Sequence, residues 1–427
     1  MRARRRSALE NTNTPVAVLG GGVSGRAAAG LLRRLGKTAE IFDERGGDRG
    51  CAGFRPAPGE YALAVVSPGF RPGHPWRRLA REAGIPVEGE TEFAAAFWPG
   101  RLLCVTGTNG KTTLARFLEK ALRANGESAR ACGNIGLPLS ALCDGSERAG
   151  DIAVCETSSF QLYDWARPRC EAAFWTNFAP DHLDWHESTA GYFAAKWRLV
   201  GSGAPVFAGA TVRDHAMAAG MPVPGNLRVA APLPPGAAPA EGFFARPPFD
   251  SLYALAAAWW RSTGRPEAVP AETARVFEPP PHRMESLGTA AGLSFVNDSK
   301  ATNFHAALAA VRALPGPIRW IGGGSDKGED PAALAAGLAD RIASADTFGA
   351  TGRDLADGLR AAGVPAGRHD SLAAAFGSAV ARARPGDTVL LSPGFASFDQ
   401  FSGYAERGDA FRAAVRDLAL SPGTKID

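Results

Sequence analysis

The residues most able to do chemistry lie in the run Val105-Thr-Gly-Thr-Asn-Gly-Lys-Thr-Thr113, between an apolar stretch and a helical pattern. A glycine-rich loop that joins a strand to a helix turns backbone N–H groups toward a polyphosphate, and the helix N-terminus adds partial positive charge. Lys111 would reach the outer phosphates, and the Thr112 hydroxyl would bind Mg²⁺. Val105 stands where the common pattern has a glycine, and the glycine comes later, at Gly107. The run therefore predicts a nucleotide site with a shorter variant of the phosphate loop.

A second glycine loop, Gly20-Gly-Gly-Val-Ser-Gly25, follows an apolar run, and Asp43 ends the next one. This arrangement satisfies the fingerprint of dinucleotide-binding proteins, in which the glycines admit a pyrophosphate. Taken alone it indicates an NAD- or FAD-dependent oxidoreductase, but the same turn can hold the diphosphate of a UDP-sugar. Both interpretations stay open from these residues.

Other polar groups come directly after apolar, strand-like runs. Glu156 and Asn177 end two of them, where sites form in open α/β sheets, and a carboxylate there suits Mg²⁺. Asp181-His-Leu-Asp-Trp-His186 resembles a metal cluster but lacks the further His or Cys of a closed zinc site. Three more polar runs follow apolar stretches near the C-terminus: Asn297–Asn303, Ile321–Gly328 and Leu391–Phe401. Three polar runs at the ends of strands, all on one edge of a sheet, favour a substrate site. We call such runs strand exits.

These runs need a scaffold of alternating strands and helices, which implies parallel sheets. Strands are expected at 16–19, 39–42, 62–66, 101–105, 151–155, 172–176, 293–296, 318–321, 347–348 and 388–391. Helices are expected at 76–83, 114–123 and 252–260, and short strands and loops at 201–250. The pattern predicts an α/β protein of three domains. These are an N-terminal Rossmann-like sheet (1–98), a central P-loop ATPase-like domain (99–281) and a C-terminal Rossmann-like domain (282–427).

Composition narrows the function classes. The chain has 427 residues, of which 45% are hydrophobic and 21% charged, as in ordinary globular proteins. No apolar run approaches the ~20 residues that span a bilayer, and the basic N-terminus lacks the apolar core of a signal peptide. The net charge of +4 does not suggest a nucleic-acid partner, and the six cysteines show no CxxC spacing, so a reducing cytoplasm is expected.

Taken together the motifs resemble the Mur ligase family, and within it the branch that adds D-glutamate. The matching runs occur in family order and extend from about residue 16 to 414: Thr106–Thr113, Gly133–Gly136, Glu156–Leu162, Asn177–Asp184, Ala194–Lys196, His282–Arg283, Asn297–Asn303 and Leu391–Phe401. The resemblance implies an ATP-dependent ligase, a monomer, that joins D-glutamate to UDP-N-acetylmuramoyl-L-alanine through an acyl phosphate. ATP and Mg²⁺ are the implied cofactors.

The resemblance also implies residue roles. Lys111, Glu156, His182, Lys196 and Lys300 would be catalytic. The ATP site would comprise Gly107, Thr108, Asn109, Gly110, Lys111, Thr112, Thr113, Arg283 and Asp298. Substrates would be held by Ser24, Arg45, Asn134, His182, Thr302, Lys327, Ser397 and Tyr404. Mg²⁺ would be bound by Thr112, Glu156, His182 and Lys196, the last as a carbamate, because a carbamate supplies anionic oxygens where an ammonium would repel the ion.

One segment departs from the family pattern. The family carries His-Asn-x-x-Asn near residue 250, where its asparagines help to hold adenine; here Phe249, Asp250 and Tyr253 stand at those positions. An aromatic ring can replace hydrogen bonds to a base by stacking, so Tyr253 is expected to do so with weaker discrimination against GTP. Two other classes stay open: an NAD(P)-dependent oxidoreductase, and a catalytically silent relative that acts as a binding protein.

Overall fold

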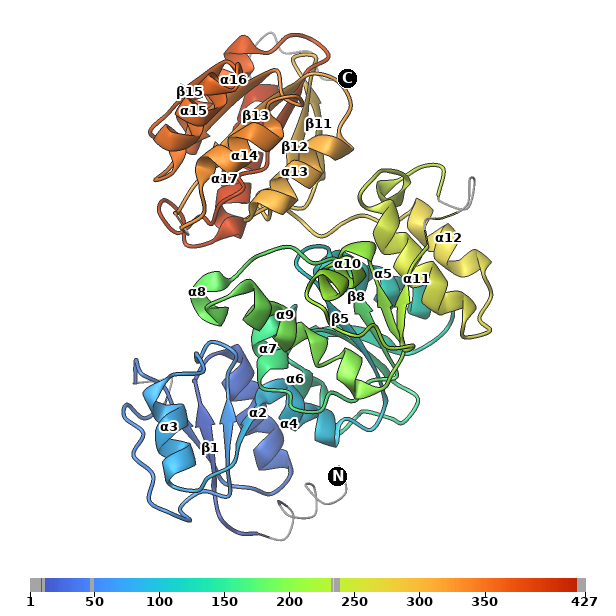
Figure 1. Cartoon of the computed structure of the whole chain (residues 1–427), viewed down its shortest axis with the longest axis vertical. Helices are drawn as coiled ribbons and strands as arrows, with labels where there is room; N and C mark the ends of the chain where they lie inside the picture. The colour runs from blue at the N-terminus through green and yellow to red at the C-terminus, as the bar shows by residue number, and fades with distance from the viewer. Residues whose placement is uncertain are drawn as a thin grey trace. The chain divides into compact units, whose positions relative to one another are not determined.

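The computed structural model describes residues 9, 12–46, 50–231, 233, 239–326 and 328–420, and three sheets organise them (Figure 1). All four strands of the first sheet and all six of the second pair in parallel, whereas the third is mixed. This is the α/β class that the sequence predicts.

The first sheet has the strand order β2-β1-β3-β4. Its elements are β1 (Val16–Leu19), α2 (Val23–Arg34), β2 (Ala39–Phe42), β3 (Leu63–Val66), α3 (Pro75–Glu82), β4 (Val87–Gly89) and α4 (Glu90–Phe97). Strand residues alternate between two cores: Val16 and Val18 pack with α2 and α4 on one face, and Ala17 and Leu19 pack on the other.

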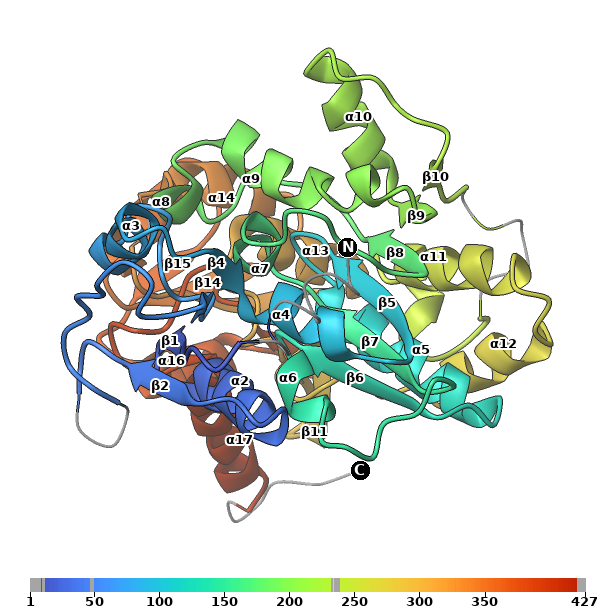
Figure 2. The same ribbon diagram turned by 90° about the horizontal axis from the view of Figure 1, so that it is seen from below.

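The second sheet has the order β10-β9-β8-β5-β7-β6, and Figure 2 shows β8, β5, β7 and β6 side by side. Its strands are β5 (Arg101–Thr106), β6 (Ala129–Gly133), β7 (Ile152–Glu156), β8 (Ala172–Trp175), β9 (Val206–Ala208) and β10 (Leu227–Val229). Its helices are α5 (Lys111–Ala124), α6 (Leu139–Leu142), α7 (Ser159–Tyr163), α8 (Leu183–His186), α9 (Thr189–Trp197), α10 (Ala210–Ala218), α11 (Asp250–Arg261) and α12 (Ala268–Arg275), with 3₁₀ turns η2 (Val200–Ser202) and η3 (Phe243–Ala245). The stretch 201–250 thus contains short strands, as predicted, and also α10, which the sequence analysis does not predict.

The third sheet has the order β11-β12-β16-β13-β14-β15, with β11 antiparallel to β12 at the edge. Its strands are β11 (Glu285–Ala290), β12 (Leu293–Asn297), β13 (Ile318–Gly323), β14 (Ser344–Phe348), β15 (Ala366–Arg368) and β16 (Thr388–Leu391). Its helices are α13 (Phe304–Ala313), α14 (Pro331–Leu338), α15 (Gly352–Ala361), α16 (Leu372–Arg382) and α17 (Tyr404–Ala419). Leu390 faces the core under α13, α14 and α15, whereas Val389 and Leu391 face the core under α16 and α17, so both faces are covered.

By packing, the chain divides into two compact units. One comprises Met1–Ala238 with Ser251–Arg275, and the other comprises Pro239–Asp250 with Val276–Asp427. A single buried core runs from β1, α2 and α4 to β5, β6 and β7, which explains why the first two sheets fall in one unit. The boundaries at 98/99 and 281/282 remain predictions. In the part of the chain that is described, no helix is long and apolar enough to cross a bilayer.

Candidate active site

The phosphate loop lies between β5 and α5, as predicted. Gly107 and Gly110 have φ of +145° and +80°, which side chains rarely adopt. Both are also crowded: a Cβ would meet Thr176 Oγ1 at 1.9 Å from Gly107 and Leu252 Cδ2 at 2.8 Å from Gly110. Glycine is therefore required twice, by conformation and by space.

The loop is fixed by hydrogen bonds to the neighbouring strand exit. The Asn109 N–H donates to Asn177 Oδ1 at 3.0 Å, and Asn177 Nδ2 donates to the Asn109 carbonyl at 3.2 Å. Thr108 Oγ1 donates to the Ala179 carbonyl at 3.0 Å. Lys111 Nζ donates to the carbonyls of Gly107 and Thr108 at 2.9 and 2.8 Å, so its charge is held at the loop. Thr113 is buried behind the loop in α5.

A carboxylate and a hydroxyl meet beside this loop. Thr112 Oγ1 donates to Glu156 Oε2 at 2.8 Å, and Asn134 Nδ2 donates to Glu156 Oε1 at 2.8 Å. Glu156 is 2% exposed. Among the described residues no cluster of three or more His, Cys, Asp or Glu side chains forms a metal cage. A hard oxygen pair next to a phosphate loop nevertheless fits Mg²⁺, which is usually held by one or two carboxylates, water and phosphate oxygens.

Lys196, in α9, is buried against the same loop. Its Nζ donates to Thr106 Oγ1 at 3.1 Å and to the Gly107 carbonyl at 3.0 Å, and it lies 4.8 Å from the centre of the Tyr192 ring. Burial lowers the pKa of the Lys196 ammonium well below its usual range, and the positive charge of Lys111 lowers it further. Lys111 and Lys196 thus share one acceptor, the carbonyl of Gly107.

His182 lies at the start of α8 with a left-handed φ of 55°. Its ring packs against Phe160 of α7, with centroids 4.8 Å apart, and its Nε2 lies 3.8 Å from an Asp181 oxygen. The His186 ring stacks on that of Phe160, with centroids 5.7 Å apart, and burial lowers the pKa of His186 to about 4, so the ring is neutral near pH 7. The run around His182 is an aromatic cluster in which no metal-binding set forms among the described side chains.

The first glycine loop lines a cavity of about 490 Å³. Its wall includes Gly20, Gly22, Val23, Ser24, Asp43, Glu44, Arg45, Ser67, Pro68, Gly69, Phe70, His74 and Asn134. The predicted contacts Ser24, Arg45 and Asn134 are therefore brought together. Asp43 shapes this loop, because its two carboxylate oxygens accept the N–H groups of Gly21 and Arg45 at 2.8 and 3.0 Å.

In the second unit, the predicted residues gather where β12 and β16 end. Asp298 is buried and accepts from the Met284 N–H at 3.1 Å and from Ser392 Oγ at 2.9 Å. Burial raises the pKa of Asp298 to about 6, although the positive charge of Arg283 opposes the shift. Lys300 Nζ lies 5.3 Å from the centre of the Tyr404 ring.

The remaining predicted residues of this unit are placed as follows. Thr302 is half-buried beside Lys300, and Ser397 is buried after β16. The Gly394 N–H donates to the Ala301 carbonyl at 2.9 Å, which ties the two exits together. Lys327 lies outside the described residues.

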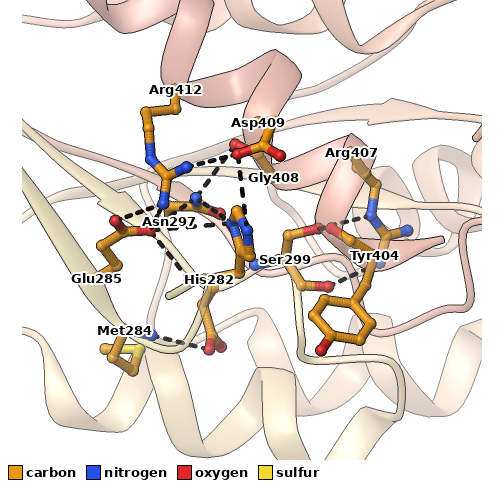
Figure 3. Close-up of polar contacts among 11 residues, drawn as sticks. His282, Met284, Glu285, Asn297, Ser299, Tyr404, Arg407, Gly408, Asp409 and Arg412 are labelled. Atoms are coloured by element: carbon orange, nitrogen blue, oxygen red, sulfur yellow. Dashed lines mark hydrogen bonds and ion pairs between the residues drawn. The ribbon is translucent and has the colours of Figure 1, made fainter. Parts of the chain in front are cut away.

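Sequence reasoning missed the residue that joins these exits. Arg407 of α17 is fully buried and donates to the carbonyls of Ser299, Phe395 and Ala396 at 2.9, 3.0 and 3.2 Å. Figure 3 shows Arg407 beside Ser299. Arg407 also lies 3.5 Å from the Gly323 carbonyl at the end of β13. No motif marks it, because an arginine in an amphipathic helix normally faces water.

His282 belongs to a second cluster under α17 (Figure 3). Asn297 Nδ2 donates to His282 Nδ1 at 3.0 Å, so Nδ1 is an acceptor and the ring is neutral. Burial lowers the pKa of His282, which agrees with that assignment. Gly408 is required here, since a Cβ would lie 2.2 Å from His282 Nδ1.

The expectation for Tyr253 is wrong. Tyr253 is 4% exposed, and its ring lies 5.9 Å from that of Phe117 in α5. The adjacent Leu252 would lie 2.8 Å from a Cβ at Gly110, so this part of α11 lies next to the phosphate loop. A ring buried in this way does not present a face to a base.

Comparison with known proteins places this geometry in a family. Residues 105–216 match the Mur ligase middle domain, and residues 282–395 match the glutamate ligase domain of Mur ligases. The chain is 37% identical to UDP-N-acetylmuramoylalanine--D-glutamate ligase of Mycobacterium avium, over 94% of this chain and 96% of that protein. The protein belongs to the Mur ligase family.

Solved structures agree at the level of the fold. UDP-N-acetylmuramate-alanine ligase MurC of Thermotoga maritima aligns with a TM-score of 0.59 at 15% identity, over 94% of this chain and 99% of that one. The folylpolyglutamate synthase/dihydrofolate synthase solved with Mn, AMPPNP and L-glutamate aligns with a TM-score of 0.55 at 19% identity, over 76% of this chain and 93% of that one. The chain therefore shares its fold with these two proteins, and the Mur ligase family uses ATP.

Proposed function

We propose that this Mur ligase joins D-glutamate to UDP-N-acetylmuramoyl-L-alanine at the expense of ATP. One observation carries the proposal: Asn134 lines the cavity of the first glycine loop and also donates to Glu156, which accepts from Thr112 of the phosphate loop. A cavity suited to a nucleoside diphosphate therefore ends at the place where a γ-phosphate would lie. An oxidoreductase would need no phosphate loop at that end.

The chemistry begins with positioning. The uridine diphosphate end of the substrate would be held by Ser24, Arg45 and the glycine loop, and its L-alanine carboxylate would lie near Asn134 and His182. Transfer of the γ-phosphate to that carboxylate gives an acyl phosphate. Because little covalent work falls to the protein in phosphoryl transfer, Lys111 would contribute by neutralising charge on the phosphates.

Thr112 and Glu156 would hold Mg²⁺, with His182 and Lys196 completing the set. The ion would supply neutralisation of phosphate charge. The neutral Lys196 amine favoured by burial is the form that adds to CO₂, and the resulting carbamate would place anionic oxygens beside Lys111. Carbamylation would thus place a negative group beside the positive charge of Lys111, an attraction that the neutral amine does not provide.

D-Glutamate would bind to the second unit through Thr302, Lys327, Ser397 and Tyr404. Its amine attacks the acyl phosphate, and phosphate leaves from the tetrahedral intermediate. Lys300 would stabilise the charge on that intermediate, while Arg283 and Asp298 would contact the nucleotide.

The test is release of phosphate from ATP in the presence of UDP-N-acetylmuramoyl-L-alanine and either D- or L-glutamate. We expect release with D-glutamate only when all three substrates are present, and no change in nicotinamide absorbance with NADH or NADPH. Release with L-glutamate alone would contradict the proposed stereochemistry, and the absence of ATP turnover would contradict a ligase.

A further inference from the structure

Arg77 of α3 is an arginine turned entirely into the protein. It is 0% exposed, its Nη1 donates to the Phe70 carbonyl at 2.8 Å, and its Nη2 forms an ion pair with Asp164. Asp164 follows α7 directly and its side chain is 9% exposed. One side chain thus joins a helix of the first sheet to a helix of the second.

At one end, the Arg77 side chain is bonded to the wall of the cavity. Phe70 lines the 490 Å³ cavity, and its ring stacks on Trp76 with centroids 5.8 Å apart. Hydrogen bonds from a charged donor are about twice as strong as neutral ones. The bond from Arg77 therefore fixes the backbone of this part of the wall.

At the other end it holds the helices of the phosphate site. The guanidinium groups of Arg77 and Arg198 lie 6.0 and 5.4 Å from the centre of the Tyr163 ring, at the end of α7. Arg198 follows α9, which carries Lys196. Phe160, at the other end of α7, packs against His182.

Stability alone does not account for this pair. A buried ion pair is often no more stabilising than an apolar pair of the same size, because desolvation of the charges offsets their attraction. Burial raises the pKa of Asp164 despite the opposing charge of Arg77, which shows how strongly the site disfavours charge. Unlike an apolar pair, the ion pair and the hydrogen bond of Arg77 are directional, so they fix the orientation of the groups that they join.

We propose that Arg77 is a positioning residue that fixes the Phe70 wall of the cavity to α7. It thereby sets the distance between the uridine diphosphate end of the substrate and the carboxylate that is phosphorylated. This inference rests on the proposed function and adds to it a residue that touches none of the three substrates.

The experiment compares wild type with the double variant Arg77→Met, Asp164→Leu, which keeps side-chain volume and removes the directional bonds. We expect Tm close to that of wild type, KM for UDP-N-acetylmuramoyl-L-alanine raised at least roughly fivefold with a lower kcat, and KM for ATP within about twofold, because misplacement by even 1 Å is costly. Arg77→Lys keeps the charge but loses the fork that reaches two acceptors, and should show the same split. Arg78→Met is the control, since Arg78 is 69% exposed on the same helix.

A purely structural role would give the opposite pattern. It predicts that the double variant, with a Tm close to that of wild type, also has a normal KM for the UDP substrate. That result would overturn the proposal. If the double variant does not fold, a normal KM for the UDP substrate in Arg77→Lys overturns it equally. Failure of the proposed function is distinguishable, because wild type itself would then release no phosphate with D-glutamate.

Discussion

The phosphate loop and the C-terminal strand exits are both polar ends of parallel strands, but different forces hold them. At the phosphate loop the candidate catalytic side chains bond to the loop and to one another: Thr112 to Glu156, and Lys111 and Lys196 to one carbonyl. At the C-terminal exits a buried arginine, Arg407, holds the loops through their carbonyls. In the first region, substitutions should therefore have the largest effect at residues that would touch the reactants. In the second region, they should have the largest effect at a residue that would touch none of them.

The largest effect is expected at the first region. Lys111→Ala should lower kcat by on the order of 10³-fold, because preorganised charge is lost where phosphate charge develops. Tm should change little, since the lysine donates to carbonyls of the loop rather than packing in a hydrophobic core. Lys120→Ala, an exposed position of the same helix, is the control. Turnover near that of wild type in Lys111→Ala would show that the loop does not bind the transferred phosphate.

Lys196→Ala sharpens the comparison within the same region. If a carbamate forms, this variant should be nearly inactive and should regain activity with acetate or formate, which replace the missing oxygen ligands. ¹³C NMR with labelled bicarbonate should show a carbamate signal in wild type that is absent from Lys196→Ala. Lys111→Ala should gain nothing from acetate. An active wild type without the carbamate signal would rule out the modification.

In the second region, a substitution of Arg407 should mainly lower the stability of the protein. Arg407→Met removes the donor from the carbonyls of Ser299 and Phe395, whereas the Ala396 carbonyl still accepts from the Ser325 N–H. Each buried acceptor without a donor costs ~1–3 kcal/mol, so the free energy of unfolding should fall by at least about 2 kcal/mol. In the folded fraction, KM for D-glutamate should rise while KM for ATP changes less. Arg416→Met, exposed on the same helix, should be neutral. Equal changes in both KM values would contradict a role confined to the strand exits.

The same contrast explains what the sequence could predict. The phosphate loop and its partner Glu156 were predictable, because a glycine pattern and a strand end are local features whose geometry is nearly fixed. The roles of Arg77 and Arg407 were not predictable, because an arginine in an amphipathic helix is normally expected at the surface, and only the fold shows that these two are buried. The expectation that Tyr253 stacks on a base was wrong for a related reason. Aligned motifs give the residue at a position, but they do not show that its ring packs against Phe117. The edge strand β11 likewise depends on pairing with β12 rather than on its own residues.

The smallest effect is expected from Asp298, and pH isolates it. Burial raises the pKa of Asp298 to about 6 in the folded protein, against about 3.9 in an unfolded chain. Between these values the folded state holds a proton that the unfolded state has released, so this group's contribution to stability is full below pH ~4 and is lost as pH rises to ~6. Two pKa units correspond to about 2–3 kcal/mol. Chemical unfolding of wild type and Asp298→Asn from pH 4 to pH 7 should therefore show the wild type losing stability relative to the variant, with the change complete near pH 6. A constant difference across this range would contradict the prediction, because it would mean that Arg283 and Ser392 keep Asp298 ionised in the folded protein.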